Sequence, residues 1–307
     1  MTRPRPFATL ALAVLAMLAL PVPAGAAYPM SLTDGPAANV GDLLPDIKMA
    51  PIYDVSLKYT QGGKVRLRFG STIWNIGQGP LEARGTGRQK RKMTQIRQLI
   101  HASNGTTRLV TPPGVTGFYA GDGHNHWHVS RFVTATLFPA ASGSPSPDTV
   151  RSLHKIGFCL TDSVRVPSEV APPNAAPRRA YPYTGCGTRK SQKFKMGISV
   201  GWADVYPATI AYQWVDVTRL PAGDYRLCTT PNPEGAWLEA DYANNSAWID
   251  LRLNVGTKQV TILGQGDTSC EPAATAAVAA AGLSFDWATA ALFCPLEPAI
   301  DPRIGQS

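Results

Sequence analysis

The chain has 307 residues, 44% of them hydrophobic, and a formal net charge of +8 at pH 7. This length suits one large domain or two small ones. Beyond the N-terminal stretch, no segment approaches the ~20 continuous apolar residues of a membrane-spanning helix. The positive charge comes with no recognised nucleic-acid-binding motif, so we expect no nucleic-acid partner.

The N-terminus has the pattern of a secretory signal peptide. Arg3 and Arg5 form a basic start, residues 7–20 are apolar but short for a membrane span, and residues 24–26 (Ala-Gly-Ala) fit a cleavage site. Removal of residues 1–26 lowers the formal charge from +8 to +6. We expect a secreted protein, extracellular or periplasmic, with no stable membrane insertion after cleavage. An uncleaved anchor is the alternative.

The next part of the chain predicts a strand and a basic loop. Residues 64–75, KVRLRFGSTIWN, alternate apolar and charged side chains at first, which is typical of a half-buried strand. Glycines before and after this segment indicate turns. The run RQKRK at residues 88–92 is expected to be a solvated loop, although contact with an anionic polymer or a cell wall is an alternative.

Three of the five histidines lie at every second position of the segment GDGHNHWHVSRF, as His124, His126 and His128. In a strand, such side chains share one face, and a slight bend lets them converge on one ion. Neutral imidazole suits copper, zinc, nickel and iron. Scattered surface or core histidines would not cluster so tightly, so we predict a metal site. Trp127 would then wall this site or pack behind it.

Further short strands follow, separated by segments rich in glycine and proline. Their β-branched, aromatic and alternating patterns predict a mainly β fold, an antiparallel β-sandwich-like core with long loops. The predicted strands are residues 131–138, 211–220, 224–230, 246–255 and 258–263.

Two segments depart from the strand pattern. Residues 163–195 hold many prolines and alanines and predict a long loop. Residues 271–293 are rich in alanine and predict a short C-terminal helical segment. Between the last strands, Glu239, Asp241 and the pair Asn244–Asn245 are expected to form a turn network.

Other histidine-based metal motifs do not fit. An HxHxDH motif needs an aspartate where this chain has His128, and a cupin motif needs a later glutamate and a distant histidine. The remaining histidines, His101 and His154, lie in no such motif. A three-histidine copper or zinc site with open positions is the reading that the residues alone support.

Downstream segments add a more specific pattern. They are HKIGFCLTD (154–162), GISVGWADVY (197–206), QWVDVTRLPAGDYRL (213–227) and NPEGAWLEADYANN (232–245). With the histidine segment before them, their order closely resembles the catalytic domain of the lysyl oxidase family, in the form found in bacteria. The resemblance covers roughly residues 45–255.

The resemblance implies roles for individual residues. In animal members, a CHxHYH segment supplies the copper ligands, which correspond here to His124, His126 and His128. An HK-x-x-FCL-x-D segment supplies a lysine, here Lys155, and a D-x-Y segment supplies a tyrosine, here Tyr206. That lysine and tyrosine become crosslinked as lysine tyrosylquinone, so the resemblance implies Cu²⁺ and this quinone as cofactors.

The implied activity is that of a copper- and quinone-dependent amine oxidase similar to protein-lysine 6-oxidase. It would oxidise primary amines, with peptidyl lysine as one candidate, to aldehydes, using O₂ and releasing ammonia and hydrogen peroxide. Addition of Lys155 to a quinone ring requires the neutral amine, which burial favours. Removal of a substrate proton requires a base, for which Asp204 and Asp216 are candidates. A strand-end aspartate that ties up backbone amides is the alternative for each.

The remaining predictions combine the resemblance with the cysteine positions and the composition of the terminal segments. We expect a monomer with a Cys159–Cys186 disulfide, a Cys270–Cys294 disulfide and a free Cys228. The expected parts are a signal peptide (1–26), a linker (27–44), a lysyl oxidase-like catalytic domain (45–265) and a C-terminal tail with the helix (266–307).

Two other functions remain open from the sequence. One is an exported copper- or zinc-binding β-sandwich without oxidase activity, which would not require Lys155 and Tyr206. The other is a cell-surface adhesion module with a structural metal, which would usually be closed by a fourth protein ligand. The sequence shows no such ligand, and it does not name the amine.

Overall fold

Strand β4 (Val65–Asn75) lies within a six-stranded antiparallel sheet and pairs with four other strands. Val65, Leu67 and Phe69 are buried, whereas the arginines between them are half-buried, as the alternation predicted. The other strands are β2 (Ile47–Met49), β3 (Tyr53–Tyr59), β13 (Val164–Arg165), β15 (Trp202–Tyr206) and β16 (Trp214–Asp216).

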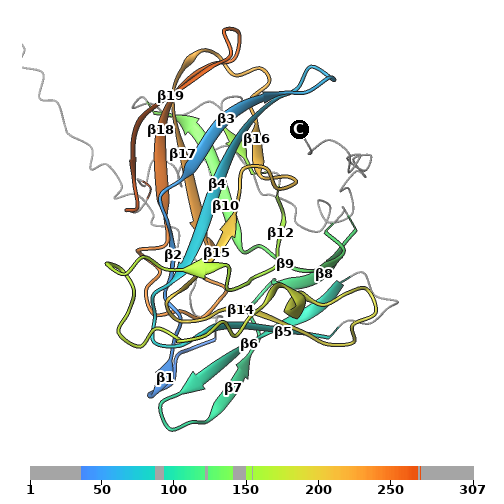
Figure 1. Ribbon diagram of the computed structural model, residues 1–307, viewed down its shortest axis with the longest axis vertical. Helices are drawn as coiled ribbons and strands as arrows, with labels where there is room; N and C mark the ends of the chain where they lie inside the picture. The colour runs from blue at the N-terminus through green and yellow to red at the C-terminus, as the bar shows by residue number, and fades with distance from the viewer. Residues whose placement is uncertain are drawn as a thin grey trace, which may run out of the picture. The chain divides into compact units, whose positions relative to one another are not determined.

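The computed structural model of the chain is shown in Figure 1. The described residues all fall in the compact unit Thr33–Ser307, and among them no helix is long and apolar enough to span a membrane. The predicted signal peptide, the basic run 88–92 and the predicted helix 271–293 lie outside them. The described residues are 36–86, 93–121, 124–140, 150–153, 155–268 and 270, with the side chain of Met93 excepted.

A five-stranded antiparallel sheet contains the strands predicted near residues 131–138, 224–230, 246–255 and 258–263. Its order is β11-β10-β17-β18-β19, and strands β17 and β19 lie beside β2 and β3 of the first sheet. The bounds are β10 (Val133–Pro139), β11 (Arg151–Ser152), β17 (Gly223–Pro231), β18 (Ala247–Asn254) and β19 (Gln259–Gly266).

An eight-stranded antiparallel sheet carries the histidine segment, and its main order is β12-β9-β8-β6-β5-β14. In Figure 1 most of its strands, among them β5, β6, β7 and β14, lie in the lower part of the view. The bounds are β1 (Asp42–Leu43), β5 (Leu81–Gly85), β6 (Met93–Ala102), β7 (Thr107–Val110), β8 (Thr116–Ala120), β9 (His126–Ser130), β12 (Gly157–Phe158) and β14 (Phe194–Ile198).

The prediction of a mainly β, antiparallel core with long loops is confirmed, with strands distributed over three sheets. The strand predicted at residues 211–220 is shorter than expected, because only Trp214–Asp216 pairs with β4. Tyr212 has a left-handed φ of 61° and the Thr218 amide donates to the Asp216 side chain, so the chain turns on both sides.

The predicted loop 163–195 is largely a loop, with two short elements inside it. It contains strand β13 and the 3₁₀ helix η3 (Tyr183–Cys186). The carboxylate of Asp162 fixes the loop at its base by accepting hydrogen bonds from the amides of Ala180 and Tyr181 at 2.7 and 3.0 Å. Asp162 therefore holds the middle of this loop against the segment that begins it.

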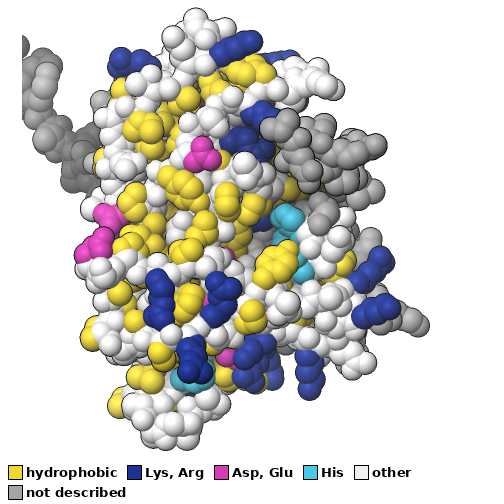
Figure 2. Space-filling model, in the orientation of Figure 1, with side chains coloured by type: hydrophobic (Ala, Val, Ile, Leu, Met, Phe, Trp, Pro, Cys, Tyr) yellow, Lys and Arg dark blue, Asp and Glu magenta, His cyan; other side chains and the backbone are white. Residues whose placement is uncertain are grey.

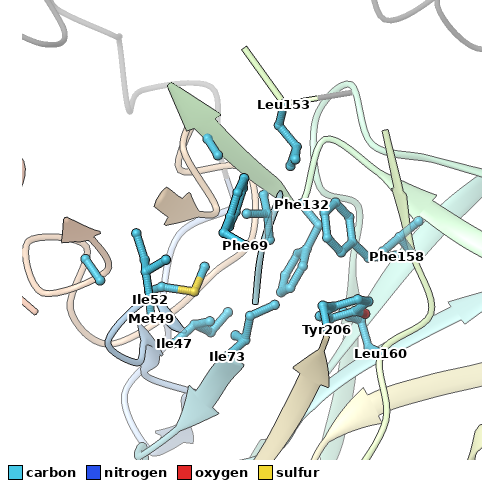
Figure 3. Close-up of a cluster of buried hydrophobic side chains, with 14 of the residues drawn as sticks. Ile47, Met49, Ile52, Phe69, Ile73, Phe132, Leu153, Phe158, Leu160 and Tyr206 are labelled. Atoms are coloured by element: carbon cyan, nitrogen blue, oxygen red, sulfur yellow. The ribbon is translucent and has the colours of Figure 1, made fainter. Parts of the chain in front are cut away.

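Aromatic side chains fill the core around Tyr206 (Figure 3). Phe132 packs edge-on against Phe158, with ring centroids 6.2 Å apart, and against Trp237 at 5.7 Å. Phe158 in turn packs edge-on against Tyr206 at 5.1 Å. Burial of each such side chain contributes about 1.5–3 kcal/mol to folding, so the core itself holds Tyr206 in place.

The predicted Cys270–Cys294 disulfide with a free Cys228 is wrong, because Cys228 is bridged to Cys270. The sheet register explains this pairing. Cys228 lies opposite Trp248, and Trp248 lies opposite Gly266, so the chain that follows Gly266 returns to the neighbourhood of Cys228. Cys294 lies outside the described residues.

The predicted turn network centres on a buried carboxylate. Glu239 is only 2% exposed, and its Oε2 accepts a hydrogen bond from the amide of Ile47 at 3.0 Å. Its Oε1 accepts from the side-chain amides of Asn232 and Asn245 at 2.5 and 2.8 Å. Burial raises the pKa of Glu239 to about 8. These bonds connect β2 to the segment between β17 and β18.

Substitution of Glu239 by glutamine should destabilise the protein. In glutamine an NH₂ group replaces one of the two acceptor oxygens. In either orientation of the side chain, this NH₂ group would face the N–H of Ile47 or the side-chain amides of the asparagines, so a buried donor would lose its acceptor. We expect the free energy of unfolding, measured by urea denaturation, to fall by about 1–3 kcal/mol. The exposed Glu169→Gln variant is the control and should unfold like the wild type. Equal stability of the two variants would contradict the network.

Candidate functional site

The three predicted metal ligands converge at the start of β9. Their ligand atoms all lie within 4.8 Å of one another, and the Nε2 atoms of His126 and His128 are 2.8 Å apart. His124 lies before the strand, and its ring stacks on that of His126 with centroids 5.5 Å apart. Between them Asn125 has a left-handed φ of 55°, a conformation that asparagine tolerates. This bend converts a straight row into a cluster.

The triad is accessible from one side and enclosed on the other. His126 and His128 are buried and His124 is half-buried. Figure 2 shows histidine side chains at the surface next to hydrophobic ones. On the opposite face of β9, Trp127 stacks on Phe194 with centroids 5.2 Å apart, so Trp127 packs behind the site. The cluster therefore has a solvent-facing side where a small molecule can approach.

Strand β12 packs against His128 through a glycine. Gly157 lies opposite Ser130 in the β12–β9 pairing, and a Cβ atom there would be 2.8 Å from both Cβ and Nδ1 of His128. Only glycine permits this close approach. Burial, followed by the positive charge of Lys155 and of the other histidines, holds the pKa of His128 well below its ordinary value. His128 is therefore neutral, which is the form that binds metals.

The lysine and tyrosine singled out by the sequence lie close together. The Nζ atom of Lys155 is 5.4 Å from the centroid of the Tyr206 ring and 5.3 Å from that of Phe158. Both Lys155 and Tyr206 are only 5% exposed. Lys155 precedes β12 and Tyr206 ends β15, so two sheets bring these residues together. A short movement of the lysine side chain would bring its nitrogen to the ring.

Asp204 holds the hydroxyl group of Tyr206. The Tyr206 hydroxyl donates to Oδ2 of Asp204 at 2.6 Å and lies 3.0 Å from the carbonyl oxygen of Cys159. Burial raises the pKa of Asp204 to about 7, although the hydrogen bonds from Tyr206 and Thr161 act in the opposite direction. Burial, followed by the nearby charge of Asp204, raises the pKa of Tyr206 well above its ordinary value. Asp204 is thus the group that can accept the Tyr206 proton.

The other candidate base has a different environment. Asp216 on β16 accepts hydrogen bonds from Thr218 and forms an ion pair with Lys64 at 3.5 Å. Burial alone would raise the pKa of Asp216, but the Thr218 hydrogen bonds and the Lys64 charge outweigh it and lower the pKa. These partners give Asp216 the character of a turn residue, the alternative that the sequence left open.

Sequence reasoning missed residues that the fold brings to the site from elsewhere. The hydroxyl of Tyr183 lies 2.7 Å from Nδ1 of His126, and Phe118 on β8 packs edge-on against His128 with centroids 5.6 Å apart. Thr161 donates to Asp204 at 3.0 Å. In the sequence, Tyr183 lies three residues before Cys186 in the predicted loop, and this spacing matches no metal or catalytic motif.

A disulfide connects the two parts of the site. The predicted Cys159–Cys186 bridge is confirmed, with Cα atoms 5.9 Å apart. Cys159 follows β12 directly and its carbonyl oxygen faces the Tyr206 hydroxyl, whereas Cys186 ends η3. The bridge therefore links the segment around Lys155 to the loop that reaches the triad.

The donor set fits a transition metal with open coordination positions. Three imidazoles suit copper or zinc, and the lysine and tyrosine beside them are not needed for metal binding alone. Within the described parts of the chain, the triad is the one group of three such ligands whose atoms come this close together. The arrangement combines a metal site with a buried amine and a buried phenol.

Comparison with known proteins identifies the family. The family profile described as lysyl oxidase matches residues 81–262, more than half of the chain. Lysyl oxidase homolog 2 of Gallus gallus is 29% identical over 155 residues, which is 50% of this chain and 17% of that protein. The same homolog of Xenopus tropicalis is 30% identical over 155 residues, which is 50% of this chain and 18% of that protein. Lysyl oxidase homolog 4 of Mus musculus is 32% identical over 122 residues, which is 40% of this chain and 14% of that protein. The chain thus spans less than a fifth of the length of these relatives. It belongs to the lysyl oxidase family.

Proposed function

We propose that the protein is a copper-dependent amine oxidase of lysyl oxidase type, similar to protein-lysine 6-oxidase. It would oxidise primary amines to aldehydes with O₂ and release ammonia and hydrogen peroxide. The observation that carries this proposal is the position of Lys155, with its Nζ 5.4 Å from the Tyr206 ring centroid and close enough to the triad to influence the pKa of His128.

The residues present fit the cofactors of such an enzyme. His124, His126 and His128 would hold Cu²⁺, and Lys155 and Tyr206 are the residues from which lysine tyrosylquinone would form. When present, copper and the quinone supply the electron sink that ordinary side chains lack. The support for the metal is the closeness of the three ligand groups, within 4.8 Å of one another.

The surrounding side chains have roles that their contacts define. Asp204 accepts the hydrogen bond of the Tyr206 hydroxyl at 2.6 Å, so it can take up the phenol proton when the ring is oxidised. With a pKa of about 7, it can also release that proton near neutral pH. Phe158 lies beneath the lysine nitrogen and excludes water from one side of it.

The site favours an oxidase over an exported copper- or zinc-binding protein without activity. Burial of a lysine amine costs free energy, and a simple metal carrier gains nothing from it. Lys155 is 5% exposed, and its Nζ lies 5.3 and 5.4 Å from the ring centroids of Phe158 and Tyr206. A structural metal in an adhesion module would usually have a fourth protein ligand. Both alternatives predict an unmodified Lys155 and Tyr206 in the copper-loaded protein.

We further propose that the protein acts outside the cytoplasm as a monomer. Its Cys159–Cys186 and Cys228–Cys270 disulfides are typical of oxidising compartments, and the N-terminal sequence has the signal-peptide pattern. The substrate would be a free primary amine or a lysine side chain. A charge of +6 after signal removal provides no bulk attraction for a basic substrate, so local contacts would select it.

Replacement of His126 by alanine should remove copper binding. His126 is a proposed direct ligand, so its loss should lower copper affinity by more than the roughly 10–100-fold that loss of an outer hydrogen-bond partner causes. Copper content after dialysis, measured by elemental analysis, should drop from one equivalent to near zero. His101→Ala, which changes a histidine on β6, is the matched control and should keep its copper. Full occupancy in the His126 variant would contradict the ligand assignment.

Activity should appear only after copper is added to metal-free protein in air. Quinone absorbance and peroxide release from a primary amine should then develop together, and Tyr206→Phe should show neither. Zinc is the matched control, because it suits the same imidazoles but has no redox chemistry. An oxidase that is active without exposure to copper, or a fully active Tyr206→Phe variant, would refute the proposed function.

A further inference from the structure

Tyr183 makes a contact with the triad that its location in an exposed loop does not suggest. The side chain is 60% exposed, yet its hydroxyl lies 2.7 Å from Nδ1 of His126. Its ring also packs edge-on against the imidazole, with centroids 4.7 Å apart. Both the hydroxyl and the ring of Tyr183 therefore contact the same ligand, His126.

The two nitrogens of His126 face different partners. Nε2 lies 2.8 Å from Nε2 of His128, on the side where the triad converges, and Nδ1 faces the hydroxyl of Tyr183. A metal held between His126 and His128 would take the Nε2 lone pair, so the remaining proton of neutral His126 must reside on Nδ1. That N–H then requires an acceptor, and the oxygen of Tyr183 is at the right distance for it.

The fold fixes Tyr183 in this position. The residue begins η3, which lies beside β9 and β14 and is visible as a short coil in Figure 1. At the other end of η3, Cys186 is fully buried and bridged to Cys159. The amide of Gly185 donates to the carbonyl oxygen of Pro182 at 2.8 Å and closes the turn around Tyr183. The turn and the disulfide together hold the Tyr183 hydroxyl next to His126.

We propose that Tyr183 is a positioning residue of the metal centre, whose hydroxyl oxygen accepts a hydrogen bond from the Nδ1–H of His126 and thereby fixes the tautomer and orientation of that ligand. This inference rests on the proposed function, because it takes the histidine triad as the metal site. The Pro-rich loop would then be part of the metal centre, and the Cys159–Cys186 bridge would act on copper binding through Tyr183.

The test compares Tyr183→Phe with wild type in the full-length, disulfide-bonded protein. The variant keeps the ring against His126 and removes only the acceptor oxygen. We expect Cu²⁺ affinity, measured by competition with a chromophoric chelator, to fall about 10–100-fold. The electron paramagnetic resonance spectrum of the bound Cu²⁺ should also change, because the donor strength and angle of one imidazole change.

A matched control separates this effect from a general loss of structure. Tyr242→Phe removes the hydroxyl of another partly exposed tyrosine, which accepts a hydrogen bond from the Glu239 amide at 3.3 Å. It should leave both the affinity and the spectrum unchanged. The unfolding temperature of the metal-free Tyr183→Phe protein should stay close to that of the wild type, which locates the effect in the metal complex.

The possible outcomes distinguish this inference from the proposed function. Wild-type affinity and an unchanged spectrum in Tyr183→Phe would overturn the role of Tyr183 while leaving a copper site in place. Unchanged copper affinity in the His126→Ala variant would instead refute the proposed metal site, and the inference with it. Weaker binding with an altered spectrum in Tyr183→Phe alone is the result that supports the proposal.

Discussion

The site depends on the close pairing of β12 with β9. Gly157 lies opposite Ser130, and this short ladder places the lysine segment directly against the histidine strand. A side chain at position 157 would collide with His128, so the approach depends on a glycine. Lys155 and Cys159 lie on either side of this contact, which therefore positions both the amine and the disulfide.

The site also depends on the burial of polar groups in an aromatic core. Tyr206 packs against Phe158, and its hydroxyl is bound by Asp204, so a phenol and a carboxyl group share a site from which water is largely excluded. Burial raises the pKa of Asp204 to about 7, which makes a proton exchange with the phenol feasible near neutral pH. A buried polar pair with shifted pKa values is more typical of functional sites than of an ordinary core.

Local patterns predicted the parts of the structure that depend on local order. The alternation at residues 64–75 identified β4, and the spacing of the histidines and the family motifs identified the triad, Lys155 and Tyr206. The pattern could not reveal Tyr183 or the Cys228–Cys270 bridge, because both depend on which distant segments the sheets bring together. For the same reason, the short extent of β16 followed from turns that its apolar pattern did not show.

The proposed function requires that copper convert Lys155 and Tyr206 into a single crosslinked cofactor. Peptide mass spectrometry of the protein after incubation with copper and air tests it directly. We expect one peptide that joins the segments around Lys155 and Tyr206, and we expect it to be absent from metal-free and zinc-treated samples. Two separate, unmodified peptides from a fully copper-loaded protein would contradict the claim and identify a metal-binding protein instead.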